Sequence, residues 1–189
     1  MSEQLQESAE TKTRAIQTCT EPLQRAADLI LGSIRNRGKL ILCGNGGSAA
    51  DAQHLAAEMV VQLSHNFKRP GLPAIALTTD SSILTAGGND IGFDQIFARQ
   101  LEALGQPEDI LLVITTSGNS KNIINALAMA REKNIKSIGF LGGDGGQCVK
   151  DVTISVTVPS KNTQRIQETH ITLGHILIEL VERDLHDKK

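Results

Sequence analysis

The first part of the chain carries apolar residues at the spacing of a helix. Residues from about 3 to 36 favour helix throughout, and the second half of this stretch presents one apolar face, which predicts burial on that side. The residues of this face are Leu23, Ala26, Ala27, Ile30 and Ile34. Pro22 suits the first turn of a helix, so we expect a new helical segment to begin after Thr20.

Beyond residue 38, short apolar runs alternate with longer stretches of helical periodicity. Several of the runs are continuously apolar, which is typical of strands covered on both faces. The predicted strands are Lys39–Cys43, Ala74–Leu77, Ile110–Thr115, Ser137–Leu141 and Val152–Val158, and helices are expected near residues 48–64, 92–104, 120–133 and 162–185. This alternation predicts the α/β class: a three-layer α/β/α sandwich with a five-stranded parallel sheet, an N-terminal helical extension, and ligands at the carboxyl ends of the strands.

The breaks between these elements are short. Asn66–Pro73 is a polar connection and Gly142–Gly146 is a flexible turn, and neither is long enough to divide the chain. We therefore expect residues 1–189 to form a single domain, in which residues 1–37 are N-terminal helices that pack on the domain or on a partner subunit.

Composition describes a globular domain: 40% of the 189 residues are hydrophobic and the formal net charge is -2. No apolar run approaches the roughly 18 residues of a membrane span, and the first fifteen residues are too polar for a secretory signal, so we expect a cytoplasmic protein without membrane association. Cys19, Cys43 and Cys148 lack CxxC spacing and are expected to be free thiols. Nucleic acid is not an expected ligand, because Trp and Tyr are absent and no basic groove is evident.

A glycine-serine loop joins a strand to a helix within Cys43–Glu58, which reads CGNGGSAADAQHLAAE. Small residues let backbone N–H groups approach a phosphate, and the helix N-terminus adds partial positive charge. His54 and Glu58 are four residues apart, so they share one face of the helix beyond this loop. Phosphate binding beside acid-base or metal chemistry indicates an enzyme, although the pair alone could be a surface contact worth a few tenths of a kcal/mol.

A second strand-loop-helix unit repeats this pattern. The strand Ile110–Ile114 leads into Thr115–Ser120, where hydroxyl side chains and a glycine precede a helix. Either loop alone could be an ordinary turn with a helix cap. Two such loops at the same end of one sheet favour an oxyanion site.

The first loop also resembles a dinucleotide fingerprint, since it contains Gly44-x-Gly46-x-x-Ala49. That fingerprint requires an acidic residue about 20 positions onward. Asp80 follows Gly44 by 36 positions, which is too far for a compact unit. The run of small and hydroxyl residues in the second loop also favours a phosphomonoester over NAD.

The last predicted helix carries Gln167, His170 and His175. These residues could be capping or packing groups, and nothing in the periodicity connects them with His54 and Glu58. His65 and His186 have the setting of ordinary surface residues.

Five motifs in order give the chain its resemblance to a known family. They are CGNGGSAADAQH, RPGLPAIALTTD, GGND, TTSGNS and RIQETHITLGH, between about Ile41 and Glu182. Together they resemble the phosphoheptose isomerases, a family of sugar-isomerase (SIS) domains. The resemblance implies interconversion of sedoheptulose 7-phosphate and D-glycero-D-manno-heptose 7-phosphate through an enediol, the first step toward ADP- or GDP-heptose precursors of bacterial surface polysaccharide such as lipopolysaccharide.

The same resemblance assigns site residues and a cofactor, with one Zn²⁺ per subunit. It implies that Glu58 and His175 are catalytic, and that the metal ligands are His54, Glu58, Gln167 and His175. The implied substrate-binding residues are Asn45, Gly46, Gly47, Ser48, Glu58, Asn89, Asp90, Thr115, Thr116, Ser117, Ser120 and Gln167. Isomerisation needs a base near C1 and C2 and an acid for the oxygens, and zinc can polarise the carbonyl. Thr115 stands where the family often has Ser, and the hydroxyl is kept.

Spacing adds a hypothesis about assembly. Gln167 and His175 are eight residues apart, an offset of about 12 Å along a straight helix. We therefore expect the site to lie at a subunit interface with some groups donated by a neighbour, in agreement with the homotetramer that the resemblance implies.

Two other functions compete with this interpretation. Some SIS proteins similar to this family bind the replication initiator DnaA, and they typically lack the catalytic acid and base, whereas this chain keeps Glu58 and His175. An isomerase or sensor of another sugar phosphate is the second alternative, and sensors often carry an extra domain that this chain has no room for.

Overall fold

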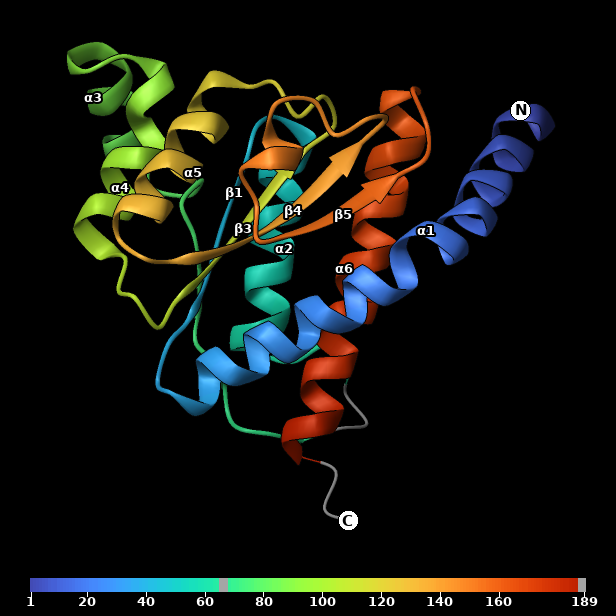
Figure 1. Cartoon of the computed structure of the whole chain (residues 1–189), viewed down its shortest axis with the longest axis horizontal. Helices are drawn as coiled ribbons and strands as arrows, with labels where there is room; N and C mark the ends of the chain where they lie inside the picture. The colour runs from blue at the N-terminus through green and yellow to red at the C-terminus, as the bar shows by residue number, and fades with distance from the viewer. Residues whose placement is uncertain (65–67, 187–189) are drawn as a thin grey trace.

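The computed structural model describes residues 1–64 and 68–186, and over these residues the chain forms one five-stranded sheet (Figure 1). The strands are β1 (Leu40–Gly44), β2 (Ala74–Ala76), β3 (Ile110–Thr115), β4 (Lys136–Gly142) and β5 (Ile154–Val158). They lie in the order β2-β1-β3-β4-β5, and every neighbouring pair is parallel. The predicted five-stranded parallel sheet is therefore confirmed.

The central strands are β1 and β3, and all of their residues are buried. The chain moves outward from β1 to β2 on one side and from β3 through β4 to β5 on the other. Such a reversal of strand order leaves a crevice between the two loops at the carboxyl ends, where α/β proteins bind ligands. Because Gly44 pairs with Ile114, the loops that follow β1 and β3 begin side by side.

Helices cover both faces of the sheet and complete the three layers (Figure 1). One face carries α1 (Ser2–Arg35), α2 (Gly47–Val60) and α6 (Thr163–His186), which pack on alternate strand residues such as Leu40 and Leu42. The other face carries α4 (Ile96–Leu104) and α5 (Lys121–Glu132), which pack on the intervening residues such as Ile41 and Cys43. Side chains that alternate in this way are expected of strands buried on both sides.

The prediction of a break before Pro22 is wrong, because α1 is one continuous helix of 34 residues with Pro22 inside it. A proline inside a helix costs about 3 kcal/mol. Here the buried face runs without interruption past the proline, from Ala15 and Cys19 to Leu23 and Ala26. Burial on both sides of Pro22 outweighs the lost backbone hydrogen bond.

The prediction missed a helix, α3 (Ser81–Asp90), which contains two glycines and no buried residue. Its start has a capping signal, since the Asp80 side chain accepts a hydrogen bond from the Ile83 N–H at 2.9 Å. Asp80, which lies too far from Gly44 for a dinucleotide site, is therefore a helix cap.

Element ends differ slightly from the predicted ranges. Short 3₁₀ turns, η1 (Phe93–Gln95) and η2 (Cys148–Lys150), precede α4 and β5, so α4 and β5 begin later than expected. His65 and part of the connection Asn66–Pro73 lie outside the described residues. Among the helices of the described part of the chain, none is both long and apolar enough to span a bilayer.

Candidate active site

The glycine-serine loop turns sharply from β1 into α2. Gly46 is the N-cap of α2 and has a φ of 56°, which favours glycine. A Cβ on Gly44 would lie 2.6 Å from the carbonyl oxygen of Ser48, so this position requires a residue without a side chain. The positive end of α2 is therefore held against the end of the central strand, as an anion site requires.

The second loop, Thr115–Ser120, is fixed by its own hydrogen bonds and by the segment that follows β4. The Gly118 N–H donates to Thr115 Oγ1 at 3.3 Å, and the Gln147 N–H donates to Asn119 Oδ1 at 3.0 Å. Ser120 is the N-cap of α5 but makes no side-chain capping hydrogen bond. Thr116 and Ser117 line a hollow of about 230 Å³ together with Lys161 and Asp144, so hydroxyls and charges of both signs lie beside this loop.

A pair of asparagines joins the two loops. Asn45 Nδ2 donates to Asn122 Oδ1 at 2.9 Å, and Asn122 Nδ2 donates back to Asn45 Oδ1 at 2.8 Å. Asn122 is buried in the first turn of α5, and sequence reasoning did not identify it. No local sequence signal connects two asparagines 77 positions apart, because their contact arises only from the pairing of β1 with β3.

Helices α2 and α6 lie side by side and run in the same direction. The Gln167 amide lies against Gly47 at the start of α2, where a Cβ would come within 2.8 Å of Gln167 Nε2. Further along, a Cβ on Gly174 would lie 2.6 Å from a Leu55 methyl carbon, so this glycine permits the close approach of the helices. Successive turns of α6 thus face successive turns of α2.

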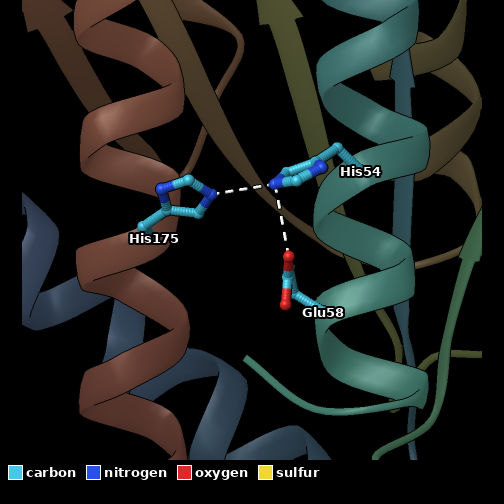
Figure 2. A group of neighbouring side chains, drawn as sticks. All are labelled: His54, Glu58 and His175. Atoms are coloured by element: carbon cyan, nitrogen blue, oxygen red, sulfur yellow. Dashed lines mark hydrogen bonds and ion pairs between the residues drawn. The ribbon is translucent and has the colours of Figure 1, made fainter. Parts of the chain in front are cut away.

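This packing brings together His54, Glu58 and His175, which extend toward one another from the two helices (Figure 2). His54 Nε2 lies 2.9 Å from His175 Nε2 and 3.3 Å from Glu58 Oε1. The three ligand atoms lie within 4.8 Å of one another, and all come from one chain. These three groups therefore meet without a neighbouring subunit, whereas Gln167, whose offset from His175 prompted the interface hypothesis, is not part of the cluster.

The cluster fits a zinc ion in composition and spacing. Imidazole nitrogens and a carboxylate are zinc ligands, and two ligands of one tetrahedral ion lie about 3.3 Å apart. The Glu58 side chain is 19% exposed and that of His54 is 48% exposed, so the cluster is open to solvent on one side. The structure places Gln167 beside the glycine loop, and this position suits the substrate contact that the resemblance implies.

Asp51 occupies the same face of α2, between Gly47 and His54, and was not identified from the sequence. Its Oδ2 atom is buried and has no hydrogen-bond partner among the described residues. Burial raises the pKa of this carboxyl group, and the nearby His54 opposes that rise. An acceptor between the loop and the cluster can receive a hydrogen bond from a bound hydroxyl group.

His170 has a structural position. It is buried, and its Nε2 lies 2.9 Å from the carbonyl oxygen of Leu141 at the end of β4. Burial lowers the pKa of His170 to about 4, so the ring is neutral near pH 7. This histidine ties α6 to the sheet between the positions of Gln167 and His175.

Asn89 and Asp90 belong to a helix on the other face of the sheet from the cluster of His54, Glu58 and His175. They end α3, and Asn89 Nδ2 donates to Asp90 Oδ1 at 2.6 Å. Helix α3 contacts η1 and α4 on the face of the sheet opposite α2 and α6 (Figure 1).

The fold and the two loops define a class of protein: residues 4–142 match the SIS domain. Phosphoheptose isomerase of Roseiflexus sp. strain RS-1 is 48% identical over 186 residues, which cover 98% of this chain and 93% of that protein. The structure of phosphoheptose isomerase GmhA from Neisseria gonorrhoeae is 44% identical, with a TM-score of 0.90 and 95% of each chain covered. That of a phosphoheptose isomerase from Francisella tularensis is 38% identical, with a TM-score of 0.92 and 96% of each chain covered.

The chain belongs to the phosphoheptose isomerase family of SIS domain proteins.

Proposed function

We propose that this protein interconverts sedoheptulose 7-phosphate and D-glycero-D-manno-heptose 7-phosphate. The observation that carries the proposal is the meeting of Glu58 with His175 on helices that begin at a glycine loop and run away from it. A base and an acid at one end, and anion-binding loops at the other, suit an aldose-ketose isomerase acting on a phosphorylated sugar.

The separation of the two ends supports a long sugar. Gly47 and His54 are seven residues apart on α2, which is about 10.5 Å along the helix axis. With C–C bonds of about 1.5 Å, an extended seven-carbon chain places its phosphorus about 9 Å from C2. A phosphate at the loops therefore leaves C1 and C2 beside Glu58 and His175.

The chemistry follows from these two side chains. The Glu58 carboxylate takes a proton from C1 of the ketose while His175 gives a proton to the carbonyl oxygen on C2, which forms the enediol. Glu58 then returns its proton to C2, and His175 recovers a proton from the oxygen on C1 as the aldehyde forms. Each group ends in its starting state, as a catalyst of a reversible isomerisation must.

We propose one Zn²⁺ per subunit as the cofactor, held by His54, Glu58 and His175, whose donor atoms suit zinc. Gln167, the fourth ligand that the resemblance implies, lies against Gly47 at the loop end of α2 and would have to turn toward the ion to bind it. A bound zinc ion supplies Lewis-acid polarisation of the substrate carbonyl and stabilises the negative charge that develops on its oxygen.

We further propose that the protein works as a homotetramer in the cytoplasm, with Asn89 and Asp90 completing the site of a neighbouring subunit. The N-terminal end of α1 projects beyond the rest of the molecule (Figure 1), and it exposes Leu5 and Ile16 by 68% and 66%. A mostly apolar hollow of about 470 Å³ lies between α1 and α6. Exposed apolar surface of this kind marks contact sites between proteins.

A place in heptose synthesis follows from the substrate, as the first step toward heptose precursors of bacterial surface polysaccharide. A non-catalytic protein that binds DnaA is not favoured, because Glu58 and His175 are present and the relatives are named as isomerases. An isomerase of a shorter sugar phosphate is disfavoured by the separation of loops and cluster.

The test is an NMR assay of the purified protein with sedoheptulose 7-phosphate, and with fructose 6-phosphate as the shorter comparison. We expect the aldose product to appear from the seven-carbon substrate only. Assays with a chelator and with added zinc test whether turnover requires the metal. Absence of turnover both with and without zinc would contradict the proposed isomerase activity. Turnover that persists with a chelator would contradict only the proposed zinc cofactor.

A further inference from the structure

A buried arginine lies at the end of α2 that carries Glu58. The Arg69 side chain is fully buried, with 0% exposure, and its partner Glu182 on α6 is 4% exposed. Arg69 Nε donates to Glu182 Oε1 at 2.6 Å. Charged side chains are seldom buried unless they are paired and hydrogen-bonded, so the burial of Arg69 and Glu182 depends on their contact.

The remaining donors of Arg69 bind the end of α2. Its Nη2 donates to the carbonyl oxygen of Glu58 at 2.6 Å, and its Nη1 donates to that of Met59 at 2.8 Å. The last four carbonyls of a helix lack partners within the helix, and a cation there also opposes the helix dipole. Arg69 thus binds the backbone of Glu58 directly.

The acidic partner anchors this arrangement to the helix that carries His175. Glu182 follows His175 by seven residues on α6, so the two side chains share a face about two turns apart. Its Oε1 also accepts a hydrogen bond from the Leu63 N–H at 3.2 Å, just beyond α2. One carboxylate therefore joins the end of α2 to the same face of α6 that holds His175.

We propose that Arg69 is a positioning residue, which sets the separation of Glu58 and His175 by holding the last turn of α2 to α6 through Glu182. The proposal rests on the proposed function for the roles of Glu58 and His175. The geometry predicts a selective effect: the anion loops lie at the opposite end of α2, so a change at Arg69 should affect the reaction at C1 and C2 more than phosphate binding.

The experiment compares Arg69→Lys with wild type, because lysine keeps the charge but has one nitrogen in place of the planar fork. We expect kcat to fall about tenfold or more, because small misplacements of catalytic groups slow a reaction strongly. The KM should stay within about twofold of the wild-type value. Glu182→Gln is the second variant, in case Arg69→Lys does not fold. It weakens the link to α6 while Arg69 can still bind the Glu58 carbonyl, so a smaller loss of kcat is expected, and an unchanged kcat in this variant overturns the link through Glu182.

The control is Asp109→Asn, which weakens another ion pair, one whose carboxylate is buried and whose lysine is partly exposed. Lys39 Nζ lies 2.6 Å from Asp109 Oδ2 and also donates to the Leu104 carbonyl oxygen. Lys39 directly precedes β1, at the end of the strand away from the cluster. Wild-type kcat in Asp109→Asn beside a reduced kcat in Arg69→Lys supports the proposal. An unchanged kcat in Arg69→Lys overturns it, and so does an equal loss in both variants, which would show a general effect of stability.

A second measurement does not depend on the reaction. Amide hydrogen exchange should become faster in the last turn of α2 in Arg69→Lys and stay unchanged there in Asp109→Asn. If wild type itself turns over no heptose phosphate, the proposed function fails, and hydrogen exchange alone decides whether Arg69 holds this turn. Unchanged exchange in Arg69→Lys overturns the positioning role.

Discussion

The side chains of Asn45 and Asn122 form a closed pair of hydrogen bonds, at 2.9 and 2.8 Å, between the two loops of the site. Each amide gives one N–H and accepts one, so the pair holds the loop after β1 at a fixed distance from the start of α5. A phosphate bound by both loops depends on that distance.

The variant Asn122→Asp should therefore weaken substrate binding. It replaces a donor to Asn45 Oδ1 by a carboxylate oxygen and adds negative charge beside the phosphate loops. We expect KM to rise about tenfold or more, which corresponds to about 1.4 kcal/mol, with a smaller effect on kcat. Initial rates over a range of substrate concentrations measure both constants.

The control for this prediction lies one turn further along α5. Asn125 Nδ2 donates to the Asp94 carbonyl oxygen, away from both loops. Asn125→Asp makes the same chemical change on the same helix and should leave KM near that of wild type. Equal values of KM for Asn122→Asp and wild type would show that the asparagine pair does not organise the site.

Mixing of inactive variants should reveal which groups share a chain. Glu58 and His175 meet within one chain, so a mixture of Glu58→Gln with His175→Gln subunits should remain as inactive as either variant. Asp90 lies on the other face of the sheet, and the proposed tetramer takes it from a neighbour. A mixture of Glu58→Gln with Asp90→Asn, dissociated and reassembled together, should recover part of the activity.

Each variant refolded alone is the control for this experiment. Recovery in the mixture of Glu58→Gln with His175→Gln would show that these side chains combine between subunits in solution. Lack of recovery in the mixture with Asp90→Asn would contradict the proposal that Asp90 completes the site of a neighbouring subunit.

The sheet and the loops could be predicted from the sequence because their signals are local. Continuous apolar runs mark β1 and β3, and glycines with hydroxyl residues mark the turns that follow them. The roles of Asn122 and Arg69 could not be predicted in this way. Their partners lie far along the chain or are backbone carbonyls, which carry no residue-specific signal.

The relation of the last helix to α2 was also beyond local reasoning. An offset of eight residues from Gln167 to His175 looked too long for both side chains to reach one ion. In the structure α6 packs parallel to α2, so Gln167 lies against Gly47 while His175 lies against His54, at a different turn. The relative direction of α2 and α6 is known only from the tertiary structure.

Zinc binding should depend on His54. After removal of metal by a chelator, we expect wild type to take up one Zn²⁺ per subunit and His54→Ala to bind it about 100-fold more weakly, because one of the three clustered ligands is lost. Titration calorimetry measures this affinity without substrate. His170→Gln is the matched control, since His170 binds the Leu141 carbonyl and lies outside the cluster. Equal zinc affinity in His54→Ala and wild type would contradict the proposed site.

The buried His170 should make the protein less stable in mild acid. Its pKa is lowered to about 4 by burial, whereas an unfolded histidine has a pKa of about 6.5. As the pH falls below about 6.5, the unfolded chain binds a proton here that the folded chain does not bind until about pH 4. The free energy of unfolding therefore decreases through this window, by up to about 3 kcal/mol from this group.

The measurement is urea unfolding at several pH values between 7.5 and 4.5, with wild type compared against His170→Gln. Glutamine can still donate to the Leu141 carbonyl oxygen but cannot titrate. We expect the variant to be less stable than wild type at pH 7.5, because its shape does not match the ring, and to lose less stability on acidification. The other histidines are the same in both proteins, so the difference in slope isolates His170. Parallel slopes would show that protonation of His170 does not contribute to acid unfolding.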